Sequence, residues 1–377
     1  MPLPLQCAPC KIVHHTAEGF PLAEWGRGRL AGNPQVFAMQ QGRILVAALG
    51  LLLFFPGALR AQDSLETIIK SRDISRTQEA TMEAEVALRF RRLADAKSAD
   101  SRESARERIT RTATIAGATP AGLAAYAKIC AAESWNLVSS EDLDNATDGI
   151  MVLSILDHPN TSETLAEGLR SKHAVVRLMA ARAIERLQDK LKDEASRVRS
   201  ALSALGRAGA TEQEAIVLRV IYQAIDFKAD VPSFKNASDS ADALAQVLDA
   251  RMSQLESGSR GEMTDDYAID AAVRCYGDAA KNVQAKLISC MYRYLAVCVG
   301  RFFDPETASE YLPTLDRHIN RIEEAIRNMA KASGGTLSCD DLKLSPRQAG
   351  NSKHQEDAMK ILDCISNALA GDPWNVR

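Results

Sequence analysis

The stretch that most constrains the fold is Ser171–Leu191, SKHAVVRLMAARAIERLQDKL, which has one apolar face at helical spacing. The residues that form this face are Val176, Ala180, Ala183, Leu187 and Leu191. Charged side chains, among them Arg177, Arg182 and Arg186, take the rest of the circumference. The small side chains of Ala180, Ala181 and Ala183 would let the backbone of a neighbouring helix pack closely against this one. Because a helix pair cannot bury such a face alone, the stretch predicts stacked helix pairs.

Together with a helix predicted over residues 161–170, the stretch resembles a HEAT repeat. The residues that carry the resemblance are Leu165, Leu169, Val176, Arg177, Ala180, Ala181, Ala183, Ile184 and Leu187. The resemblance implies an α-solenoid whose usual role is to bind a partner. Ser171 stands where the family often has Asp, and Lys172-His173-Ala174 replaces its usual Pro-containing turn. We expect the Ser171 hydroxyl to cap the second helix.

Composition also favours helices. The chain has 377 residues, enough for two domains or one extended repeat array, and only 5% of them are aromatic. No long segment alternates with the two-residue period of a strand. We therefore expect an all-α protein, with a HEAT-like α-solenoid followed by a C-terminal helical bundle.

The predicted segments differ in character. They are an upstream segment with a signal peptide (1–61, signal 39–61), a charged helical segment (62–116), HEAT-like repeats (117–230) and a C-terminal helical bundle (240–377). The Pro-, Ser- and Asn-containing stretch between 230 and 239 separates the last two as a linker.

The signal peptide is predicted from three features in order. Arg43 precedes an apolar run from Ile44 to Phe55, and the small residue Ala61 stands before Gln62. We expect translation to start at Met39, and export to the periplasm or outside the cell with cleavage near Ala61. No stable membrane span is expected after cleavage, and the alternative is an uncleaved signal anchor.

Local patterns place several helix ends. A helix that opens after Ser140 is expected to bury its last apolar residues, Ile150, Met151, Leu153, Ile155 and Leu156. A second helix pair is expected over 194–226, with its turn at Gly206 and Gly209. Thr211 with Glu214 three residues later predicts a capping box.

Six of the eight cysteines follow the signal segment. They are Cys130, Cys275, Cys290, Cys298, Cys339 and Cys364. An even number in an exported chain permits disulfides. Cys290 and Cys298 cannot pair, because eight residues of helix separate them by about 12 Å. We favour a disulfide between Cys339 and Cys364, and buried free thiols are the alternative.

The sequence carries no motif for catalysis. It has no HExxH, GxSxG, phosphate-loop or dinucleotide pattern, and its histidines lack metal-ligand spacing, so we predict no catalytic residue, metal or cofactor. A net charge of −3 on a mixed surface argues against nucleic acid as the main partner. The Arg-rich stretch from 102 to 111 is expected to form i,i+4 ion pairs on a solvated helix.

These observations favour a non-enzymatic interaction scaffold of the cell envelope. We expect Arg177, Arg182 and Arg186 to contact a protein partner from the face formed by the second helices of the pairs. The alternative for Arg177 is a bond within its own repeat, as the equivalent HEAT residue often makes.

Two other functions remain open at this level. The first is a small-ligand protein or an enzyme with a pocket in the C-terminal bundle, near Tyr292, Tyr294 and His318. The second is a structural spacer in which residues 64–115 form a long helical stalk.

Overall fold

The computed structural model describes residues 65–231, 234–257, 265–371, 373, 374 and 376. These residues belong to one compact unit, Gly57–Arg377, and contain helices and no strand, which confirms the all-α prediction for this part of the chain. The predicted signal segment, 39–61, and its cleavage point lie outside the described residues.

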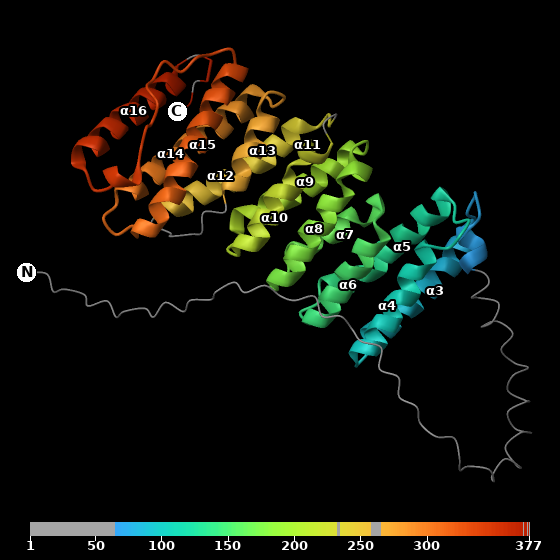
Figure 1. Cartoon of the computed structure of the whole chain (residues 1–377). Coiled ribbons are helices and arrows are strands. Elements are labelled where there is room, and N and C mark those ends of the chain that lie inside the picture. The colour runs from blue at the N-terminus through green and yellow to red at the C-terminus, as the bar shows by residue number, and fades with distance from the viewer. Residues whose placement is uncertain (1–64, 232–233, 258–264, 372, 375, 377) are drawn as a thin grey trace, which may run out of the picture. The chain divides into compact units, whose positions relative to one another are not determined.

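Figure 1 shows the helices following one another in chain order. The α-helices are α3 (Arg76–Ala94), α4 (Ala99–Ala113), α5 (Pro120–Val138), α6 (Leu143–Leu156), α7 (Ser162–Gly168), α8 (Ala174–Leu191), α9 (Ala195–Thr211), α10 (Ala215–Ile225), α11 (Phe227–Asp230), α12 (Ala237–Glu256), α13 (Asp266–Tyr276), α14 (Lys281–Phe303), α15 (Leu312–Ala332) and α16 (Ser352–Ala370). Short 3₁₀ helices are η1 (Pro159–Thr161), η2 (Ser309–Tyr311) and η3 (Pro346–Gln348).

Most helices pack on the next helix and on the helix after it. Contacts join α3 to α5, α5 to α7, α7 to α9, α9 to α12 and α12 to α14. A second series joins α4 to α6, α6 to α8, α8 to α10, α10 to α13 and α13 to α15. One cluster of buried apolar residues runs from Ala131 to Trp374, so the segments 117–230 and 240–377 share a core.

Helix α8 has the apolar face that its sequence predicts. Val176, Ala180, Ala183 and Leu187 are all buried, and the helix packs on α6, α7 and α10. Its predicted cap is wrong. The helix begins at Ala174 with His173 as the N-cap residue, and the Ser171 hydroxyl accepts only from the His173 N–H, at 3.2 Å.

The turn predicted at Gly206 and Gly209 is also wrong, because α9 continues through both glycines to Thr211. A Cβ atom at Gly206 would lie 3.2 Å from the Ala243 Cα, and one at Gly209 would lie 2.7 Å from Val247 Cγ2. Both glycines thus bring α9 close to α12. Since Thr211 ends α9, the capping box predicted for it does not form.

The charged segment before α5 is packed into the protein. Helices α3 and α4 contact each other as well as α5 and α6. Arg102 and Arg106 of α4 both bind the buried carboxylate of Asp148 on α6, Arg102 at 2.6 Å. The i,i+4 ion pairs predicted on a solvated helix for residues 102–111 are therefore wrong for Arg102 and Arg106, which instead hold α4 to α6 through Asp148.

The C-terminal end is held covalently. A disulfide joins Cys339 to Cys364 on α16, with their Cα atoms 5.9 Å apart. The α15 side chain of Arg327 donates to the carbonyls of Cys339 and Asp340 at 3.1 and 3.0 Å, and Glu323 accepts from the Leu342 N–H. The loop between α15 and α16 is thus held to α15 as well as to α16.

The remaining four cysteines of the described residues are buried thiols outside any disulfide. Among the helices that the structure describes, none combines the length and apolar character needed to cross a bilayer.

Candidate functional site

An apolar groove crosses the exposed side of α6, α8 and α10. We call it the Ile216 face, and it has a volume of about 400 Å³. Its lining residues are Met151, Ser154, Ile155, Leu178, Met179, Arg182, Arg186, Ile216 and Val220. Ile155 is 53% exposed and Ile216 is 61% exposed. Large apolar side chains this exposed, gathered in one groove, are typical of a contact surface.

The arginines of the Ile216 face differ in how they are paired. Arg182 binds Glu185 one turn along α8, at 2.7 Å. Arg186 donates to the Ser154 hydroxyl at 3.3 Å, and no carboxylate of the described residues lies within ion-pair distance of it. The apolar groove is therefore bordered by a guanidinium whose charge is not neutralised by the part of the chain described.

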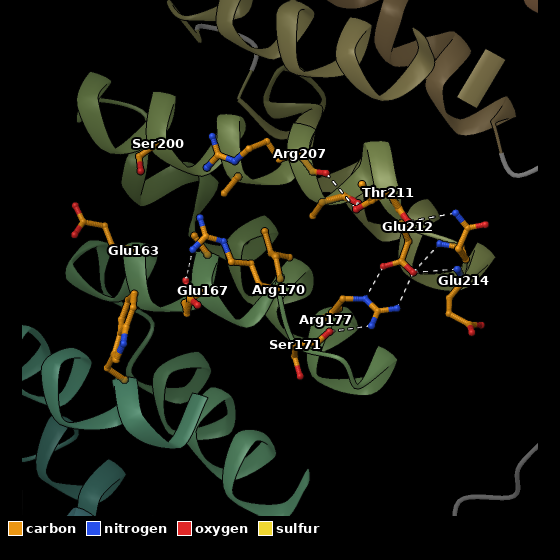
Figure 2. Close-up of a pocket in the computed structure, with 16 residues that line it drawn as sticks. Glu163, Glu167, Arg170, Ser171, Arg177, Ser200, Arg207, Thr211, Glu212 and Glu214 are labelled. Atoms are coloured by element: carbon orange, nitrogen blue, oxygen red, sulfur yellow. Dashed lines mark hydrogen bonds and ion pairs between the residues drawn. The ribbon is translucent and has the colours of Figure 1, made fainter. Parts of the chain in front are cut away.

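A second groove lies over α5, α7 and α9 (Figure 2). We call it the Trp135 groove. It has a volume of about 770 Å³ and contains Trp135, which is 43% exposed. The side chains labelled in Figure 2 are mostly charged, and some of them are paired, with Arg170 bound to Glu167 at 2.9 Å. This groove offers one aromatic contact among polar groups.

Arg177 lies at one end of the Trp135 groove, where Figure 2 shows it facing Glu212. Its guanidinium makes two parallel bonds to the Glu212 carboxylate and donates to the carbonyls of Ser171 and Lys172. The hydrogen bonds to Glu212, and then its negative charge, raise the pKa of Arg177 above its ordinary value. Burial alone would raise the pKa of Glu212, but hydrogen bonds from Arg177 and from the Glu214 N–H outweigh burial and lower it.

The structure does not bring the three predicted arginines to one surface. Arg177 lines the Trp135 groove, whereas Arg182 and Arg186 line the Ile216 face. Arg177 is ion-paired with Glu212, which lies between α9 and α10. A single ridge of three basic side chains therefore does not form. Arg182 and Arg186 remain together on the second helix of a pair, next to apolar side chains.

The apolar part of the Ile216 face was not predicted from the sequence. Of the five apolar residues expected to be buried here, Ile150 and Leu153 are buried and Met151 and Leu156 are partly buried, but Ile155 is exposed. The signal that could have revealed the site is position on the helix, since Ile155 lies off the face that Ile150 and Leu153 share.

The residues of the alternative C-terminal site are core residues. Tyr294 and His318 are buried, and Tyr292 is partly buried. His318 Nε2 lies 3.9 Å from Asp266 Oδ2. The Tyr294 hydroxyl has no hydrogen-bond partner among the described residues. These side chains belong to the packing of α13, α14 and α15.

A buried polar cluster lies nearby that the sequence did not reveal. Tyr222 donates to Asp265 Oδ1 at 2.6 Å, and Arg251 Nε donates to the same oxygen at 3.2 Å. Burial, and then the adjacent carboxylate, raise the pKa of Tyr222 well above its ordinary value. The cluster joins α10, α12 and the start of α13 through groups far apart in sequence. Within the described ranges, no group of three or more His, Cys, Asp or Glu side chains could hold a metal ion.

Comparison with known proteins gives little. No protein-family model matches the chain, and no curated protein matches it. One similar solved chain comes from work described as "Computational Design of Self-Assembling Cyclic Protein Homooligomers". It is 14% identical, and the alignment covers 81% of this chain and 95% of that chain with a TM-score of 0.16. A likeness at that TM-score carries no argument about this protein.

Proposed function

We propose that this protein is an exported, non-enzymatic interaction scaffold built as a HEAT-like α-solenoid. In this proposal the stack of helix pairs continues from the repeats into α12–α15, so the C-terminal segment extends the array. The support is the two series of helix contacts from α3 to α15, in which a helix packs on the one two positions along, or three positions along where the short α11 intervenes. Stacked pairs of this kind create extended surfaces for partners.

The docking site in this proposal is the Ile216 face, and its occupant is an amphipathic segment of a protein partner. The single observation that carries it is the exposed apolar groove across three helices, with Ile155 and Ile216 on it. An amphipathic helix laid in a groove would bury these side chains. A carboxylate at the edge of the occupant would meet Arg186, whose charge no described carboxylate neutralises.

Site-specific photo-crosslinking in the native host tests the docking site. A photoreactive residue is placed at Ile216, and a control is placed at Met359 on α16, which is also an exposed apolar position. We expect a discrete crosslinked protein from Ile216 and not from Met359. The docking proposal is wrong if both positions give the same products, or if Ile216 gives none.

Export is tested separately by sequencing the N-terminus of the protein isolated from its native host. We expect the mature chain to start at Gln62. A mature chain that begins at Met1 or Met39 would rule out cleavage and the envelope location that depends on it.

A further inference from the structure

A third groove lies between α3 and α4 and is lined by arginines. It has a volume of about 890 Å³, within the size range of small-ligand sites. From α4 it receives Ser101, Ser104, Arg108 and Arg111, at spacings of three and four residues. From α3 it receives Glu85, Arg89 and Arg92, and from the C-cap of that helix Asp95, at similar spacings. Each set therefore lies on one face of its helix, and the two faces form the walls of the groove.

The charges in this groove do not cancel. Arg89 is occupied, since it binds Glu85 at 3.1 Å and donates to the Arg108 carbonyl and the Thr112 hydroxyl. Arg92, Arg108 and Arg111 make no ion pair with any carboxylate among the described residues. The unpaired carboxylates on the lining are Glu66 and Asp95, which leaves three guanidinium groups against two acidic groups.

The arginines of α4 lie on two different sides of the helix. Arg102 and Arg106 both bind the Asp148 carboxylate on α6, and Arg102 also lies 4.0 Å from the Asp144 carboxylate. The helix thus uses one pair of arginines to pack on α6 and presents Arg108 and Arg111 to the groove. Like charges one turn apart repel each other, so an anion between them would remove a destabilising interaction.

We propose that this groove binds a small ligand with two or more phosphate groups, held by Arg92, Arg108 and Arg111. A guanidinium presents a planar set of donors that matches phosphate oxygens in bidentate pairs. Ser104 supplies a hydroxyl on the same wall. The ligand is either a soluble polyphosphate compound or the headgroup of an anionic lipid, because both present the same oxyanion.

Calorimetric titration of the full-length protein with tripolyphosphate in about 0.15 M salt tests the site. We expect saturable binding that weakens by at least about tenfold in the double variant R108Q/R111Q, since each lost charged hydrogen bond costs more than a neutral one. The matched control is R76Q/R91Q, which removes two exposed α3 arginines that do not line the groove. It should bind like the wild type.

Co-sedimentation with vesicles that contain cardiolipin, an anionic lipid whose headgroup carries two phosphates, separates the two sources of phosphate. Vesicle binding without tripolyphosphate binding, lost in R108Q/R111Q, supports the site with a lipid headgroup as ligand. The single variant R92Q gives an independent reading if the double variant folds poorly. The inference is overturned if the wild type binds neither probe, or if R76Q/R91Q loses as much affinity as R108Q/R111Q.

Discussion

The guanidinium of Arg177 binds the carboxylate of Glu212 through two parallel hydrogen bonds, 2.7 Å from Nε to Oε2 and 2.8 Å from Nη2 to Oε1. The Glu212 side chain is only 1% exposed and also accepts from the N–H groups of Gln213 and Glu214 at 3.0 Å. Arg177 lies in the first turn of α8, and Glu212 lies between α9 and α10. The pair therefore ties one pair of helices to the next.

Replacement of Arg177 should destabilise the fold. Arg177→Ala leaves a buried carboxylate without its cation, and we expect a loss of about 3 kcal/mol in the free energy of unfolding. The matched control is Arg182→Ala, whose partner Glu185 is more exposed, with an expected change within about 0.5 kcal/mol. Urea denaturation measures both. Equal stabilities for the two variants would show that the Arg177 pair does not hold the helix pairs together.

The same pair should make stability depend on acid pH. The folded-state pKa of Glu212 is below its usual 4.5, because hydrogen bonds from Arg177 and Glu214 outweigh the effect of burial. Between these two pKa values the unfolded state binds a proton that the folded state does not, so stability falls as pH falls below about 4.5. We expect Arg177→Ala to lose less stability than the wild type over that range. Parallel losses in urea titrations at several pH values would contradict this.

Periodicity accounts for what the sequence predicted well. The apolar face of α8 repeats at helical spacing and is buried as predicted. Helix type and inward face depend on local pattern, and a single sequence contains that pattern.

What the sequence did not predict depends on distant residues. Gly206 and Gly209 look like a turn, yet their role comes from α12, which lies over them. Arg177 and Glu212 are 35 residues apart and Arg106 and Asp148 are 42 apart, so no local spacing reveals either pair. The exposure of Ile155 likewise depends on which side of α6 its neighbours cover. Contacts between residues this far apart in sequence can be identified only once the three-dimensional structure is known.

The close approach of α9 to α12 gives a further prediction. Gly209→Ala would place a Cβ 2.7 Å from Val247 Cγ2, and we expect a loss of about 1–3 kcal/mol from overpacking. The matched control is Gly300→Ala on α14, where nothing lies within 4 Å of the new Cβ. It should gain up to about 1 kcal/mol, because alanine favours helix. Denaturation curves that move the same way for both variants would contradict the packing of α9 on α12.

The disulfide should stabilise the C-terminal end. Cys339 and Cys364 are 25 residues apart, and a cross-link that closes such a loop contributes about 3 kcal/mol in the chain-entropy account. We expect reductant to lower the thermal midpoint of the wild type. The double variant C339S/C364S should melt at the lower midpoint with or without reductant. A wild-type midpoint that reductant leaves unchanged would show that the bond contributes nothing to the measured transition.

The affinity of the crosslinked partner for variants of the Ile216 face tests the proposed function most directly. Burial of one isoleucine contributes about 1.5–3 kcal/mol, so Ile216→Glu should raise the Kd by roughly tenfold or more. Arg186→Glu should also raise the Kd, since it would repel the partner's carboxylate, and both variants should keep the wild-type melting curve. Met359→Glu, on α16, should bind like the wild type. A Kd for Ile216→Glu equal to that of the wild type would contradict docking at this face.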